Sequence, residues 1–250
     1  MPSKRDVLRI AREQLALDYN CSAGDFDRED NTIVANTLRA GRRMYSNDGC
    51  FFKAACFGRG AVVFADPSIH EWCHSYLDGV DGVWLFGIPR LNAYEKKLGE
   101  FGHELADMHH FYLPDMEKHP VTEIAPVKWF KKEEILQFKD DKRFAEAFSF
   151  SESQPDVLGL AAYEGDTIIG MAGASADSKT LWQIGIDVTP KYRGLGLGTY
   201  LVNLMKQEVL RHGVVPFYGT AESHIHSQNI ALSAGFFPAW VEAYSKKKGT

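Results

Sequence analysis

The sequence lacks three features: a long apolar run, an excess of basic residues and closely spaced cysteine pairs. No apolar run reaches the ~18 residues needed to span a bilayer, so no membrane partner is expected. The balance of 28 basic against 33 acidic residues gives a net charge of −5. A general nucleic-acid binder would carry a basic excess or stripe, so no nucleic-acid partner is expected. The four cysteines form no C-x-x-C pair, which favours reduced thiols in the cytoplasm.

No secretory signal is expected either, because the first residues lead into an amphipathic stretch and not into a continuous apolar core. A hydrophobic content of 45% and a charged content of 24% are typical of a globular protein. At 250 residues, one large domain or two of ordinary size are expected. Prolines 114, 120 and 126 punctuate the middle. We therefore expect an N-terminal domain over residues 1–120 and a second domain over 121–250.

The N-terminal half has mixed patterns and no countable repeat. Apolar residues at helical spacing predict helices, and short β-rich runs between turn residues predict strands. The expected helices cover residues 3–18, 32–44, 67–77 and 91–98, and the expected strands cover 50–57, 61–65, 83–86 and 105–113. This half is therefore expected to be a smaller α+β domain.

The C-terminal half has a clearer order. A helical segment over 131–148 precedes three strands with short turns, at 157–163, 167–174 and 181–188, which predict an antiparallel meander. A glycine-rich turn follows, and then a helix that reaches His212 and is closed by Gly213 in a left-handed cap. The remaining expected elements are a strand at 214–220, a helix at 227–234, a last strand at 236–244 and a solvated lysine tail at 246–248.

The glycine-rich turn reads Arg193-Gly194-Leu195-Gly196-Leu197-Gly198. It lacks the G-x-G-x-x-G spacing of a dinucleotide fold, and Gly198-Thr199-Tyr200 is not the Gly-Lys-Ser/Thr ending of a phosphate loop. A strand, a turn of nearly bare backbone and a helix start nevertheless make an anion site, because amide N–H groups and the helix dipole both favour negative charge.

Arg193-x-x-Gly196-x-Gly198 after a proline-terminated strand resembles the acyl-CoA loop of the GNAT superfamily of N-acetyltransferases. The element order and a Gly235-Phe236 pair about 37 residues after the loop resemble the same family, over about residues 121–248. The resemblance implies an α/β (α+β) fold with a GNAT-like mixed sheet and flanking helices in the C-terminal half. It also implies acetyl-CoA as the acyl donor, held by Ile186, Val188, Arg193, Gly194, Leu195, Gly196, Leu197, Gly198, Thr199 and Ser227.

Acetyl transfer to an amine requires a proton acceptor, an N–H donor for the thioester oxyanion and a group that stabilises the leaving thiolate. The resemblance implies that the Val188 N–H is the oxyanion donor. Glu222 and His224 are the catalytic candidates, because they cluster where the thioester is expected, and Asp187 is the alternative base. Many family members carry a tyrosine as the thiolate's acid where this chain has Ala231. The acceptor is expected to be a small-molecule or peptide amine.

Several alternatives stay open. The missing tyrosine also suits a non-catalytic CoA-binding or sensor module. His70-Glu71-Trp72-Cys73-His74 is a literal H-E-x-x-H, which predicts a zinc hydrolase, although its extended context is absent and no metal is the expected outcome. Residues 92–101 faintly resemble the end of a second, degenerate acetyltransferase copy. A homo-oligomer is open as well.

Overall fold

The computed structural model describes residues 2–44, 50–117 and 122–249. The chain forms two units: one comprises Met1–Leu8, Tyr112–Thr220 and His224–Phe237, and the other comprises Arg9–Phe111, Ala221–Ser223 and Pro238–Thr250. The long strands β4 (His103–Pro114) and β10 (Phe236–Lys247) each contribute residues to both units. The division at residues 120 and 121 stays a prediction.

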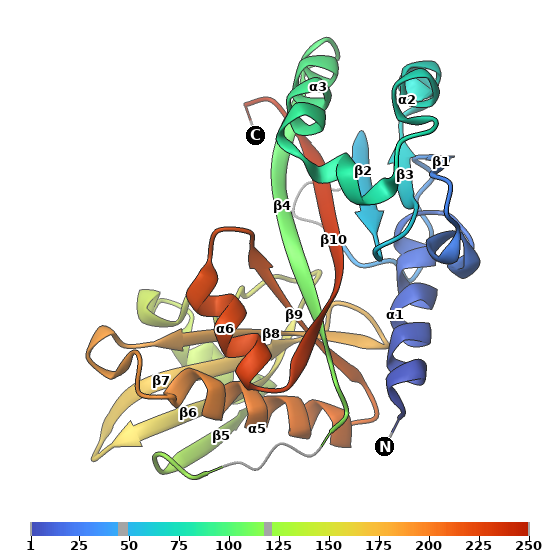
Figure 1. Cartoon of the computed structure of the whole chain (residues 1–250). Helices are drawn as coiled ribbons and strands as arrows, with labels where there is room; N and C mark the ends of the chain where they lie inside the picture. The colour runs from blue at the N-terminus through green and yellow to red at the C-terminus, as the bar shows by residue number, and fades with distance from the viewer. Residues whose placement is uncertain (1, 45–49, 118–121, 250) are drawn as a thin grey trace. The chain divides into compact units, whose positions relative to one another are not determined.

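The first unit is built on a mixed sheet in the order β4-β9-β8-β7-β6-β5. The three expected meander strands are β6 (Asp156–Glu164), β7 (Thr167–Ser175) and β8 (Leu181–Val188), and both of their pairings are antiparallel, as predicted. β5 (Val127–Lys131) adds an antiparallel strand that the sequence did not reveal. β9 (Val215–Ala221) pairs with β8 in parallel. Figure 1 shows this sheet with the helices α5 (Leu197–Arg211) and α6 (Ile225–Ser233) beside it.

Side chains on one face of this sheet pack against α5 (Leu197–Arg211) and α6 (Ile225–Ser233). Leu201 and Met205, one turn apart on α5, are fully buried against Ala172 and Ile184 of the sheet. Burying such side chains stabilises a fold by about 1.5–3 kcal/mol each. Gly213 closes α5 at φ +75°, as expected for a left-handed cap. The helix is thereby fixed with its N-terminus at the end of β8.

The opposite face carries a row of three glycines in register, because Gly159 pairs with Gly173 and Gly173 pairs with Gly185. The segment around Glu146 and Ala147 crosses the sheet there. A Cβ at Gly185 would lie 2.0 Å from the Glu146 carbonyl oxygen, and one at Gly173 would lie 1.9 Å from the Ala147 carbonyl oxygen. Glycine is therefore required at both positions for the backbone to approach this closely.

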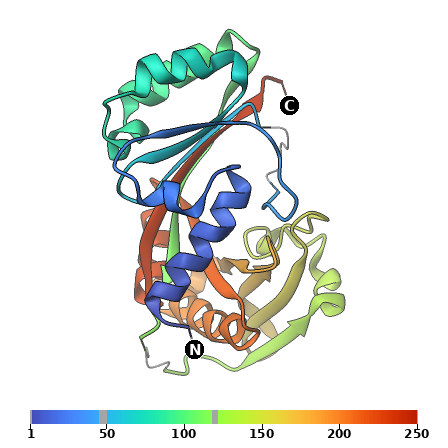
Figure 2. The ribbon, with the colours of Figure 1, turned by 90° about the vertical axis from the view of Figure 1, so that its right-hand side faces the viewer.

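The second unit has the strand order β1-β3-β2-β10-β4, with β1 (Thr32–Ala35), β2 (Phe52–Cys56) and β3 (Ala61–Ala65) as its short strands. One face of β2 and β3 packs against α2 (His70–Leu77) and α3 (Ile88–Gly99). Figure 2 shows these helices on one side of the strands and α1 (Lys4–Asp18), which belongs to this unit from Arg9 onward, on the other. This unit is α+β, as the composition of the N-terminal half indicated.

Four predictions of local structure are wrong. The helix expected over residues 32–44 is strand β1 followed by irregular chain, because β-branched Thr32, Ile33 and Val34 favour a strand that can pair with β3. The strand expected over 83–86 is a 3₁₀ turn, Gly82–Phe86, whose first N–H groups are capped by Asp81.

The third concerns the helical segment expected over residues 131–148. Only Lys132–Ile135 (α4) is α-helical, and 3₁₀ turns follow at Leu136–Phe138 and Lys142–Phe144. The apolar residues that suggested a long helix instead pack one by one against the glycine-bearing face of the sheet. The expected lysine tail also differs, since β10 continues to Lys247.

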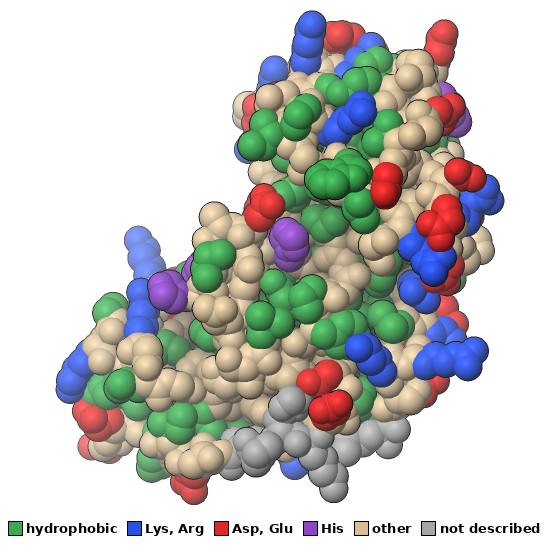
Figure 3. All heavy atoms as spheres, in the orientation of Figure 1, with side chains coloured by type: hydrophobic (Ala, Val, Ile, Leu, Met, Phe, Trp, Pro, Cys, Tyr) green, Lys and Arg blue, Asp and Glu red, His purple; other side chains and the backbone are tan. Residues whose placement is uncertain are grey.

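None of the helices in the described parts of the chain has the length and apolar composition of a bilayer-crossing segment. On the face drawn in Figure 3, acidic and basic side chains are interspersed.

Candidate active site

The glycine turn after β8 presents unused amide groups at the start of α5. A 3₁₀ turn, Pro190–Tyr192, follows the strand, and Gly194 and Gly196 then adopt φ +76° and +81°, values that favour glycine. The first helical hydrogen bond runs from the Tyr200 N–H to the Gly196 carbonyl over 3.0 Å. The N–H groups of residues 197–199 therefore precede the helical ladder and face outward, where the helix dipole favours an anion.

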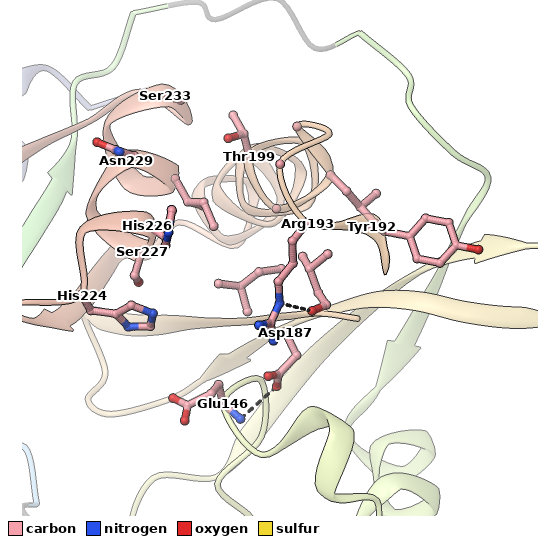
Figure 4. Close-up of a pocket in the computed structure, with 17 residues that line it drawn as sticks. Glu146, Asp187, Tyr192, Arg193, Thr199, His224, His226, Ser227, Asn229 and Ser233 are labelled. Atoms are coloured by element: carbon pink, nitrogen blue, oxygen red, sulfur yellow. Dashed lines mark hydrogen bonds between the residues drawn. The ribbon is translucent and has the colours of Figure 1, made fainter. Parts of the chain in front are cut away.

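Arg193 lies between this turn and the strand end. Its Nε donates a 2.9 Å hydrogen bond to the carbonyl oxygen of Val188, drawn as a dashed line in Figure 4. The residue is otherwise exposed and lines the pocket. Because a guanidinium has five N–H donors, the bond to Val188 fixes the group and leaves its Nη atoms available for an anion.

β8 has an open edge beside β9. In the described chain, the parallel ladder between them contains three pairs, from Leu181–Val215 to Gln183–Phe217, although β8 continues to Val188. On the other edge, the Thr189 N–H donates to Ile169 of β7. Because N–H groups alternate along a strand, those of Ile186 and Val188 point away from β7 and toward the open edge. Two amide donors are therefore free to pair with an extended molecule laid along β8.

A brace of hydrogen bonds fixes the end of β8 on the other face. The Oδ2 atom of Asp187 accepts bonds of 2.9 Å from the backbone N–H groups of both Glu146 and Ala147. Burial raises the pKa of Asp187, while these two bonds act in the opposite direction. The glycines at 173 and 185 make room for the same segment. Glu146 and Asp187, which are distant in the sequence but joined by this bond, therefore both line the pocket.

α6 forms the opposite wall. A Cβ at Gly198 would lie 2.8 Å from Ile230 Cδ1, so the missing side chain lets α5 and α6 come close. Ser227 is nearly buried on this helix, and its hydroxyl lies 2.7 Å from the hydroxyl of Tyr218 on β9. Burial raises the pKa of Tyr218 to about 12. This tyrosine was not among the residues expected from the sequence, because nothing in its spacing links β9 to α6.

Together these elements enclose a pocket of about 510 Å³. All the residues expected to hold the cofactor line it except Leu195, whose side chain is 65% exposed. Figure 4 shows Thr199, Asn229 and Ser233 toward one end and His224, Asp187 and Glu146 toward the other. The pocket therefore joins an anion-binding helix start to an end that carries titratable side chains.

Of the two catalytic candidates, His224 lines the pocket and Glu222 does not. His224 precedes α6, and the Oε1 atom of Glu222 lies 4.0 Å from His110 Nε2. Glu146 was missed, because its segment was expected to be helical. Ala231, where many family members have tyrosine, is fully buried.

The H-E-x-x-H stretch lies on α2, as expected. His70 Nε2 is 2.9 Å from the Ala65 carbonyl oxygen, and His74 Nδ1 is 3.7 Å from Asp78. Among the described residues, no group of three His, Cys, Asp or Glu side chains is placed to hold a metal ion.

Comparison with known proteins finds a match over residues 118–236 to the model of the acetyltransferase (GNAT) family. No curated protein matches the chain. Similar solved structures include a GCN5-related N-acetyltransferase-like protein from Streptococcus suis, 15% identical, with a TM-score of 0.46 over 63% of this chain and 68% of that one.

An acetyltransferase of the GNAT family from Colwellia psychrerythraea is 10% identical, with a TM-score of 0.45 over 69% of this chain and 76% of that one. A tandem GNAT protein from the clavulanic acid biosynthesis pathway is 15% identical, with a TM-score of 0.46 over 65% and 59%.

Proposed function

Because residues 118–236 form a domain of the GNAT acetyltransferase family, we propose that this protein is an N-acetyltransferase that moves an acetyl group from acetyl-CoA directly to an amine. The observation that carries the proposal is a single pocket that contains both the helix start at residues 197–199 and the open edge of β8. The first suits a diphosphate, and the second suits an extended amide chain. Coenzyme A has both, in that order.

The diphosphate would bind at the turn from Arg193 to Thr199. Its oxygens would accept hydrogen bonds from the N–H groups that precede the α5 ladder, with the Arg193 guanidinium adding a positive charge. Gly194 and Gly196 have no side chain to obstruct this approach. A pantetheine amide would then pair with the Ile186 N–H on the edge of β8, which leaves the Val188 N–H for the thioester.

The thioester would lie at the end of β8. The Val188 N–H would donate to its carbonyl oxygen, and that bond strengthens as negative charge develops on the oxygen during attack. The donor is fixed in advance, because the neighbouring Arg193 and the Asp187 brace both hold the strand end. No reorganisation is then needed when the oxyanion forms.

The amine must lose a proton to attack, since a lysine-like amine has a pKa of ~10.4. We assign proton acceptance to His224, directly or through a water, because it lines the pocket at the end where the acyl group would lie. Glu222 is the second candidate and would act at longer range. The carboxylates of Glu146 and Asp187 at the same end favour a cationic amine, small or peptidic, as the acceptor.

A non-catalytic CoA-binding or sensor module is the second candidate function, favoured by the methyl group of Ala231 where a proton donor is usual. The two are separated by incubating the protein with acetyl-CoA and a panel of amines and reading thiol release. Acceptor-dependent release with acetylated product supports the transferase. Coenzyme A binding without release above the background for any amine supports the sensor.

A further inference from the structure

The hydroxyl pair of Ser227 and Tyr218 lies where the site lacks a group for the leaving thiolate. Ala231 is fully buried, and its methyl group cannot donate a hydrogen bond. Ser227 is on the same helix, one turn before Ala231, and therefore on the same face. Ser227 is 8% exposed and lines the pocket. The serine thus presents a hydroxyl beside the place where the expected tyrosine is missing.

Tyr218 lies behind this serine, at the end of a 2.7 Å hydrogen bond, and is 2% exposed. Its ring packs near Phe236, with 6.3 Å between the centroids. Burial raises the pKa of Tyr218 to about 12, so the phenol keeps its proton near neutral pH. When it donates that proton to Ser227 Oγ, the serine's own hydrogen is free to turn toward the pocket, since a hydroxyl has one donor and two acceptor sites.

The position of Ser227 suits the sulfur end of the donor. It belongs to the first turn of α6, and Figure 4 shows it on the side of His224, whereas Ser233 at the far end of the helix lies toward Thr199. A diphosphate at the α5 start would place the sulfur away from Thr199 and toward this first turn. The open edge of β8 starts beside that turn, where Arg193 binds the Val188 carbonyl oxygen, and runs back past Ile186, so an extended arm paired with it also leads away from Thr199.

We infer that the Ser227 hydroxyl donates a hydrogen bond to the departing thiolate and that Tyr218 is the positioning residue that holds and polarises it. The inference rests on the proposed acetyl-CoA-dependent transfer. As the amine nitrogen bonds to the acyl carbon, the carbon–sulfur bond breaks and its electron pair stays on sulfur. The amine proton passes to His224, and the thiolate leaves as an anion that takes its proton from water. Ser227 and Tyr218 keep their protons throughout.

The test is the pKa of the coenzyme A thiol when bound, followed by the ultraviolet absorbance of the thiolate at saturating protein across a pH series. This measurement needs no knowledge of the acceptor. The wild type is expected to lower the thiol pKa relative to free coenzyme A. Ser227→Ala should raise the bound value by about 1 unit, a tenfold loss of thiolate, as expected for losing one hydrogen bond to an anion. Tyr218→Phe should produce a smaller rise.

Tyr163→Phe is the matched control, because this tyrosine packs on the other face of the sheet. It should leave the bound thiol pKa unchanged. Equal thiol pKa values in the wild type, Ser227→Ala and Tyr218→Phe would overturn the inference while leaving coenzyme A binding in place. Failure of the wild type to bind coenzyme A would overturn the proposed function and this inference together. If Ser227→Ala does not fold, Tyr218→Phe alone decides the question by the same measurement.

Discussion

The carboxylate of Asp187 and the backbone N–H of Glu146 are joined by a 2.9 Å hydrogen bond, 41 residues apart in the sequence. A second bond of the same length, from the Ala147 N–H, ends on the same oxygen. These bonds tie an irregular segment to the end of β8, where the thioester is expected. They occupy Oδ2 and hold the side chain against residues 146–147, so we interpret Asp187 as a brace.

Replacing Asp187 distinguishes a brace from a base. Asp187→Asn keeps an oxygen that can accept both N–H groups, and it should retain acyl transfer within about threefold, a change under 1 kcal/mol. Asp187→Ala leaves two N–H groups without an acceptor and should lower the free energy of unfolding by about 2 kcal/mol. Urea unfolding and steady-state kinetics check both. Loss of activity in a stably folded Asp187→Asn would make this carboxylate the base.

The glycine row supplies a second prediction. Gly185→Ala and Gly173→Ala should each lower the free energy of unfolding by about 3 kcal/mol, because the new Cβ would meet a backbone carbonyl that cannot rotate away. Gly24→Ala is the control, since its Cβ would meet nothing closer than 3.9 Å and should change stability by less than about 0.5 kcal/mol. Equal stability of all three variants would mean that residues 146–147 do not lie on the sheet.

The catalytic candidates make the third prediction. His224→Ala should lower kcat by about a hundredfold with little change in the affinity for acetyl-CoA, because it removes proton acceptance and not cofactor contacts. Glu222→Ala should have a smaller effect. His212→Ala, at the C-terminal end of α5, is the control. Wild-type kcat in both the His224 and Glu222 variants would remove the assignment.

Tyr218 makes the fourth prediction, on stability against pH. Its pKa is raised from 10.0 to about 12, so the unfolded chain loses the phenol proton first as pH rises. The stabilisation is complete below pH 10 and is lost between pH 10 and about 12, by about 3 kcal/mol. Tyr218→Phe should show a shallower decline over this range in thermal unfolding. Parallel curves for the two proteins would contradict the burial of this hydroxyl.

The sequence was most informative where a local pattern had one physical solution. Pro190, the glycines of the turn and the leucines of α5 predicted a strand end, a turn and a helix, and these elements form, while the anion site at the turn stays a prediction. It failed where tertiary pairing decided the outcome. Thr32–Ala35 became a strand because β3 offers an edge, and the run ending at Phe148 stayed irregular because the glycine row accepts its backbone.

The N-terminal half illustrates the same limit. α3 is followed by Gly102 at φ +74° and the twelve-residue strand β4, much as α6 is followed by Gly235 at φ +77° and the twelve-residue strand β10. This likeness agrees with the faint resemblance of residues 92–101 to the end of a second acetyltransferase copy. The strand expected over residues 83–86, ahead of α3, is instead the 3₁₀ turn Gly82–Phe86. A second, degenerate copy therefore stays a prediction.

Binding of acetyl-CoA to the intact protein, measured by isothermal calorimetry, tests the diphosphate site most directly. The wild type should bind, and Thr199→Glu should bind at least tenfold more weakly, because a carboxylate at the third helical position would cap the α5 amides itself while leaving the helix stable. Thr167→Glu, which adds the same charge at an exposed strand end outside the pocket, should bind as the wild type does. The absence of heat from the folded wild type at millimolar acetyl-CoA would contradict the site.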